Sequence, residues 1–189
     1  MNKITFARWV SIVGHPFTFI MLLVLLPFRT RGRGDALFAA GVVVAAALLA
    51  LGLFMRRRHA SGRWQTVDAS APADRPVLYL AHFAVLVPLS LYFLLIIRST
   101  YLIRVSAAIG LMLAVGAVLN RWIKLSGHLA FAGFSAVVFT RVRSCYGLPI
   151  ILCIPFLAWS RVALARHTFP EVIGGLAGGL AAGGVMLFL

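Results

Sequence analysis

The residue that first suggests chemistry is Glu171, the sole glutamate in a chain of 189 residues. His167 lies four residues before it, so a helix that begins near Thr168 would bring the two side chains together across one turn. A carboxylate beside an imidazole fixes the ring tautomer and stabilises the charge that develops on it. Arg161, six residues before His167, adds a guanidinium suited to a bidentate grip on phosphate or carboxylate. This segment therefore predicts an oxyanion site around a paired histidine.

The same segment also has a purely structural interpretation. Residues 168–171 read Thr-Phe-Pro-Glu, which matches a capping box with proline in the first helical turn. The two interpretations are compatible, because a cap would hold the Glu171 carboxylate close to His167.

A second polar cluster occupies residues 120–128, between two apolar runs. The following span must start near Ser126 to be long enough, which makes Ser126 the predicted N-cap, with Gly127 and His128 in the first turn. Amides at a helix N-terminus, together with Lys124, attract an anion. The alternative is an ordinary Ser-capped helix beside a lysine that reaches for the membrane surface.

The composition predicts a membrane protein. The chain is 62% hydrophobic with a mean hydropathy of +1.00, and several apolar runs approach the roughly 20 residues that cross a bilayer. We expect an all-α, multi-pass transmembrane helix bundle of about six to seven spans. The expected spans cover residues 9–28, 36–55, 77–97, a stretch that ends near 119, 126–143, 147–164 and 170–189, and the connection over 98–104 is expected to be a tight turn. His15-Pro16 is expected to kink the first span, with His15 satisfied locally.

The charge pattern indicates an anionic partner at the membrane surface. Eighteen Lys and Arg against four Asp and Glu give a net charge of +14, and the basic residues fall between the apolar runs. No basic stripe with interleaved aromatic residues suggests nucleic-acid binding. Two cysteines are too few for a disulfide framework, and no Cys/His pattern has metal-ligand spacing. We therefore expect neither a metal nor a cofactor.

The expected spans place three polar clusters on one face of the membrane. These clusters are Arg75, residues 124–128 and residues 161–171, and an even number of spans separates each pair. Together they hold two histidines, one glutamate, several cations and a Ser-Gly turn. One histidine oriented by a carboxylate can act as nucleophile and a second as general acid. This set suffices for metal-free phosphomonoester hydrolysis through a phosphohistidine.

These residues also resemble the signatures of the type-2 phosphatidic acid phosphatase superfamily. Ser160-Arg161, His167 and Glu171 are similar to its third signature, which reads Ser-Arg, five residues, His, three residues, Asp. Residues 124–128, Lys-Leu-Ser-Gly-His, resemble its second signature, Pro-Ser-Gly-His, and residues 75–76, Arg-Pro, resemble the end of its first. The chain departs from the family pattern at three positions: Asp68 stands at the first-signature lysine, Leu125 at the proline, and Glu171 at the aspartate.

The resemblance implies a role for each matching residue. His167 would be the nucleophile, Glu171 would orient it, and His128 would protonate the leaving oxygen. The groups that would hold the phosphoryl oxygens are Arg75, Arg161, Ser126 and the Gly127 amide, with Lys124 as a candidate for the missing cation. The implied substrate is a lipid phosphate, such as phosphatidic acid, a phosphatidylglycerophosphate-like lipid, or a polyprenyl phosphate or pyrophosphate.

A rival function of another class is a non-catalytic anionic-lipid-binding or transport protein that uses the same cations, since helices broken by proline also suit transporters. We expect one membrane-embedded domain over residues 1–189, made of a helical hairpin (1–55), a polar loop (56–76) and a catalytic core (77–189). The expected location is a bacterial cytoplasmic membrane. The charge pattern assigns neither the face of the site nor an oligomeric state.

Overall fold

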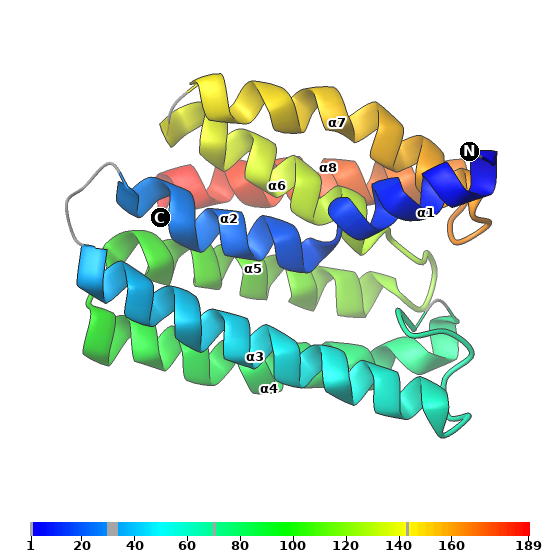
Figure 1. The fold of residues 1–189 in the computed structure, drawn as a ribbon, viewed down its shortest axis with the longest axis horizontal. Coiled ribbons are helices and arrows are strands. Elements are labelled where there is room, and N and C mark those ends of the chain that lie inside the picture. Colours follow the sequence, from blue (N-terminus) through cyan, green and yellow to red (C-terminus); the bar gives the residue numbers. More distant parts are fainter. Residues whose placement is uncertain (1, 30–33, 70, 143) are drawn as a thin grey trace. The chain divides into compact units, whose positions relative to one another are not determined.

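The computed structural model describes residues 2–29, 34–69, 71–142 and 144–189, and within these ranges every regular element is a helix (Figure 1). Six helical segments are long and apolar enough to cross a membrane: Lys3–Leu25, Phe38–Ala60, Pro72–Ile97, Thr100–Leu119, Ser144–Ala163 and Phe169–Phe188. A shorter apolar helix covers Gly127–Val142. The predicted all-helical, multi-span fold is confirmed.

The chain divides into two compact units. The first unit combines Met1–Leu23 with Ile123–Leu189, and the second unit is Val24–Trp122. Helix α2 (Pro16–Arg29) contributes residues to both units. The predicted single domain, with its subdivisions near residues 55 and 76, stays a prediction.

The first unit is built around a buried helix. It contains α1 (Lys3–Val13), α6 (Gly127–Val142), α7 (Ser144–Ala163) and α8 (Phe169–Phe188). Eleven of the sixteen residues of α6 are buried, and α6 packs against both α7 and α8, while α1 packs on α7. At 1.5 Å per residue α6 is roughly 24 Å long, shorter than the hydrocarbon core of a typical bilayer. This length is tolerable because neighbouring helices, rather than lipid, cover most of its surface.

Glycines let α6 and α8 approach until their backbones touch. A Cβ atom at Gly175 would collide with the Ser126 backbone, and one at Gly179 would collide with the Ala130 backbone. A Cβ at Gly183 would lie 2.8 Å from the side chain of Val137. Because the contact positions advance together along both helices, α6 and α8 run parallel. Their N-termini therefore lie at the same end of the first unit.

The break in the first span confirms the kink predicted at His15-Pro16. Helix α1 ends at Val13, with Gly14 as its C-cap, and α2 begins at Pro16. The Phe17 N–H donates to His15 Nδ1 at 3.3 Å, so this imidazole is satisfied locally, as predicted.

The second unit contains α3 (Gly34–Ala60), the 3-10 turn η1 (Pro72–Asp74), α4 (Arg75–Tyr92), the π-helical η2 (Phe93–Ile97) and α5 (Thr100–Leu119). The predicted turn over 98–104 is wrong in its length. Arg98 adopts a left-handed φ of 52°, and the Ser99 hydroxyl accepts from the Leu102 N–H at 3.4 Å, so α5 begins directly at Thr100. The serine cap starts the helix early and places Arg104 within α5.

The segment predicted to be a polar loop, residues 56–76, is part of the second unit and packs within it. Helix α3 extends through Arg58, whose guanidinium lies 5.6 Å from the ring centroid of Trp64, a residue only 2% exposed. The Gln65 N–H donates to Asp74 Oδ2 at 3.3 Å, and the Asn120 amide donates to the Pro72 carbonyl at 3.2 Å. These contacts fix both ends of the segment before α4.

The contact between α6 and α8 can be tested with neighbouring glycines. Gly179→Ala should lower the free energy of unfolding by about 1–3 kcal/mol, the usual cost of overpacking a closed interface. Gly178→Ala is the matched control, because a Cβ at Gly178 would meet nothing within 4 Å in the described chain, and it should leave stability unchanged or raise it by up to about 1 kcal/mol through helix propensity. Thermal unfolding of the purified proteins in detergent measures both. Equal melting temperatures for the two variants would contradict the close approach.

Candidate functional site

His167 is held by two hydrogen-bond acceptors. Its Nδ1 lies 3.1 Å from Glu171 Oε2 and 3.2 Å from the Lys124 carbonyl oxygen. A carboxylate and a carbonyl cannot donate, so Nδ1 carries the proton, and the neutral ring has its lone pair on Nε2. His167 is only 8% exposed, so the surrounding structure fixes the ring together with its tautomer.

The Glu171 carboxylate also caps helix α8. Thr168 is the N-cap, both halves of the predicted capping box are present, and the Thr168 N–H donates to Glu171 Oε2 at 3.0 Å. The same oxygen therefore accepts from the helix terminus and from the His167 ring. The predicted contact between His167 and Glu171 and the predicted capping box are therefore both present, and they share this one oxygen atom.

Lys124 ties the segment before α6 to the segment before α8. Its Nζ donates to the Arg166 carbonyl at 2.8 Å and lies 3.8 Å from Glu171 Oε2, with its side chain 19% exposed. The ammonium thus balances the Glu171 charge. Its predicted contact with a phosphoryl group stays a prediction.

Ser126 joins the starts of α6 and α8 through its backbone. Its N–H donates to the Glu171 carbonyl at 3.0 Å, and its own carbonyl accepts from the Ala130 N–H at 3.0 Å. Its hydroxyl is fully buried and has no hydrogen-bond partner within the described ranges. Ser126 directly precedes α6 and accepts its first intrahelical hydrogen bond, so the predicted N-cap position is confirmed, although the hydroxyl itself makes no capping bond in the described chain.

A tight turn after α7 fixes Arg161 relative to His167. The Arg161 carbonyl accepts from the Arg166 N–H at 3.1 Å and from the His167 N–H at 3.3 Å, and the Ala165 N–H donates to the Val162 carbonyl at 2.9 Å. Ala165 has a left-handed φ of 52°. This is a Schellman motif with alanine in the position that usually holds glycine. It turns the chain back toward the start of α8.

Helix α1 reaches the same cluster, which the sequence analysis did not predict. Arg161, 3% exposed, donates from Nη1 to Ser11 Oγ at 2.7 Å, and Ser11 Oγ lies 3.4 Å from His128 Nε2. The His15 ring stands edge-on to the His128 ring, with centroids 5.3 Å apart. In the sequence, Ser11 is marked only as a polar residue within an apolar run. Its contact with His128, 117 positions further along the chain, becomes evident only in the folded structure.

Space is open beside the start of α6. A Cβ added to Gly127 would meet no atom of the described chain within 4 Å, in contrast to Gly175 and Gly179 of α8. His128, 6% exposed, follows in the first turn.

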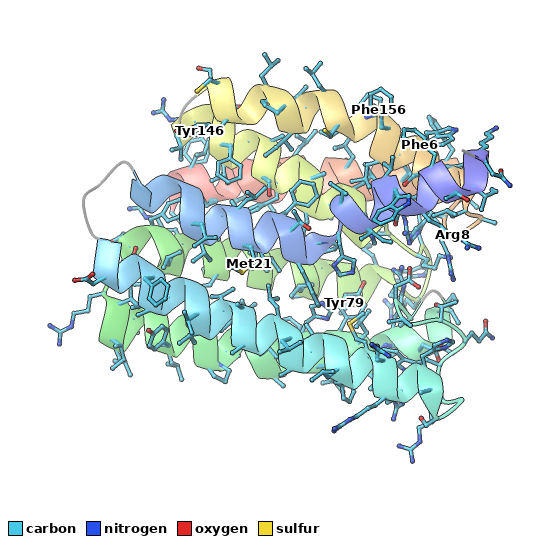
Figure 2. All side chains as sticks on the ribbon, viewed as in Figure 1. Phe6, Arg8, Met21, Tyr79, Tyr146 and Phe156 are labelled. Carbon is cyan, nitrogen blue, oxygen red and sulfur yellow. The ribbon has the colours of Figure 1, made fainter. Side chains whose placement is uncertain are left out.

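The first unit thus brings together seven of the eight predicted site residues: Lys124, Ser126, Gly127, His128, Arg161, His167 and Glu171. The eighth, Arg75, belongs to the second unit, where it is 7% exposed and hydrogen-bonded to Tyr79, which is labelled in Figure 2. Its predicted place beside the phosphoryl group stays a prediction.

No family model, curated protein or solved structure matches the chain in comparisons with known proteins. Across the described ranges, no group of three His, Cys, Asp or Glu side chains is arranged to hold a metal ion.

The double role of Glu171 can be tested by two substitutions. Glu171→Ala removes the acceptor for the Thr168 N–H and should lower the free energy of unfolding by about 1 kcal/mol, as for loss of a helix cap. Glu171→Gln keeps an oxygen at the cap and should retain most of that stability. Thermal unfolding in detergent compares the variants. An alanine variant as stable as the wild type would show that the carboxylate does not cap α8.

Proposed function

We propose that this protein is an integral-membrane, metal-independent lipid phosphate phosphatase that works through a phosphohistidine. The observation that carries the proposal is the pair of acceptors on His167 Nδ1, Glu171 Oε2 at 3.1 Å and the Lys124 carbonyl at 3.2 Å. With its proton held on Nδ1, the ring has a nucleophilic lone pair on Nε2. The carboxylate also stabilises the positive charge that the ring acquires when it attacks.

The surroundings of His167 suit a tetrahedral oxyanion. The parallel helices α6 and α8 begin at the same end of the first unit, so two helix N-termini, each partially positive, lie at the cluster. Arg161 adds a buried guanidinium, and the Gly127 position borders open space. The buried Ser126 hydroxyl, which lacks a partner in the described chain, would gain one from a phosphoryl oxygen. In this proposal Lys124 is a further phosphoryl ligand.

The proposed reaction has two steps. His167 Nε2 attacks phosphorus, the bond from phosphorus to the lipid oxygen breaks, and that oxygen takes a proton from His128. A water molecule then attacks the phosphohistidine and gives a proton to His128. The bond between nitrogen and phosphorus breaks, inorganic phosphate leaves, and His167 and His128 return to their starting states.

An apolar groove between α1 and α7 supports a lipid substrate. It has a volume of about 590 Å³ and is lined by Lys3, Phe6, Pro155, Phe156 and Trp159, of which Phe6 and Phe156 are labelled in Figure 2. The groove and the cluster involve the same two helices, α1 and α7, since Ser11 and Arg161 lie on α1 and α7 as well. Six segments of membrane-spanning length and composition support a substrate from a bilayer, and we propose a bacterial cytoplasmic membrane as the location. The proposed substrates are phosphatidic acid, a phosphatidylglycerophosphate-like lipid, or a polyprenyl phosphate or pyrophosphate.

The proposal predicts that His167→Ala abolishes phosphate release. The purified protein is incubated in detergent micelles with phosphatidic acid and with a polyprenyl phosphate, in the presence of EDTA, and free phosphate is measured. The wild type should release phosphate, and His167→Ala should lower the rate by about 1000-fold or more, because the nucleophile is lost. His59→Ala, at an exposed histidine in the second unit, should keep the wild-type rate.

The control outcomes separate the rival functions. Lipid binding without phosphate release would favour a non-catalytic anionic-lipid-binding or transport protein. Release that EDTA abolishes would indicate a metal enzyme. Full turnover by a folded His167→Ala variant would remove the phosphohistidine mechanism.

A further inference from the structure

Ser11 lies between the Arg161 guanidinium and the His128 imidazole of the cluster. Its Oγ accepts a hydrogen bond from Arg161 Nη1 at 2.7 Å and lies 3.4 Å from His128 Nε2. All three residues are less than 9% exposed: Ser11 8%, His128 6% and Arg161 3%. A hydroxyl between a guanidinium and an imidazole is therefore shielded from competing water.

Packing on both sides of Ser11 fixes this hydroxyl. Toward the N-terminus of α1, the Phe6 and Trp159 rings lie with their centroids 5.8 Å apart. Toward its C-terminus, a Cβ at Gly14 would lie only 2.6 Å from Leu157 Cδ1, so α1 and α7 are in close contact there. Ser11 is held between these two contacts and has little freedom to leave the cluster.

The hydroxyl can serve His128 in both of its protonation states. A serine has one proton to donate and two lone pairs with which to accept. One lone pair takes the Arg161 N–H. When His128 is protonated, the second lone pair can accept from Nε2–H, and when Nε2 has lost its proton, the hydroxyl can donate to it instead. The hydroxyl can therefore keep the His128 ring in the same orientation in both its protonated and its deprotonated state.

We propose that Ser11, on a helix outside all three resemblance motifs, is a positioning residue for His128. Anchored by Arg161, it orients the imidazole that delivers a proton to the leaving oxygen. This inference rests on the proposed phosphatase function and adds to it a contribution from α1. Ser11 itself does not touch phosphorus.

The dependence of the rate on the leaving group tests this role. A lipid or alkyl alcohol is a poor leaving group and needs a proton from a general acid, whereas p-nitrophenol leaves readily without one. We therefore compare kcat and KM for an alkyl phosphate, phosphatidic acid and p-nitrophenyl phosphate in wild type, Ser11→Ala and His128→Ala. Ser11→Ala should lower kcat about 10- to 100-fold on the two alkyl esters, as for loss of a hydrogen bond to a charged group. On p-nitrophenyl phosphate the loss should be less than about threefold, and His128→Ala should show the same pattern with a larger loss.

Ser135→Ala provides the matched control. Ser135 is a fully buried serine on α6 whose hydroxyl has no partner in the described residues, so its loss breaks no hydrogen bond and should leave both rates unchanged. Equal losses on the alkyl and aryl esters, or no loss on either, would overturn the role of Ser11 while leaving the phosphatase function in place. A wild type that releases no phosphate from any substrate would overturn the proposed function itself. Retained turnover of p-nitrophenyl phosphate shows that the Ser11→Ala variant is folded.

Discussion

The candidate site depends on the close, parallel contact between α6 and α8. Because Gly175 and Gly179 carry no side chains, the backbones of the two helices touch, and the Ser126 N–H can reach the Glu171 carbonyl at 3.0 Å. In a membrane, such contacts between small residues hold helices together where hydrophobic driving force is weak. Side chains larger than glycine would separate the two helix starts, and with them His128 and His167.

A single oxygen atom, Glu171 Oε2, both caps helix α8 and orients the His167 ring of the candidate site. Glu171 Oε2 accepts from the Thr168 N–H at 3.0 Å and from His167 Nδ1 at 3.1 Å, while the Lys124 ammonium lies 3.8 Å away. A helix cap is a rigid place for a carboxylate, so the imidazole beside it is oriented before any ligand arrives.

The first helix extends the site beyond the resemblance motifs. Seven of the eight predicted site residues lie within residues 124–171 of the first unit. Helix α1 adds Ser11 between Arg161 and His128, and with α7 it forms the groove proposed for a lipid tail. One helix thus contacts both the polar cluster and the apolar groove.

The sequence by itself determined the helical, multi-span architecture, the break at His15-Pro16 and the cap at Thr168, because these follow from composition and from spacing over one helical turn. It also indicated that His167 and Glu171 interact, since four residues on a helix suffice for that contact. Only the tertiary structure decided that Ser126 fails as a side-chain cap, that the Lys124 ammonium reaches Arg166, and that Ser11 joins the cluster. These contacts join segments as much as 150 positions apart, and backbone packing between helices sets them rather than any local pattern.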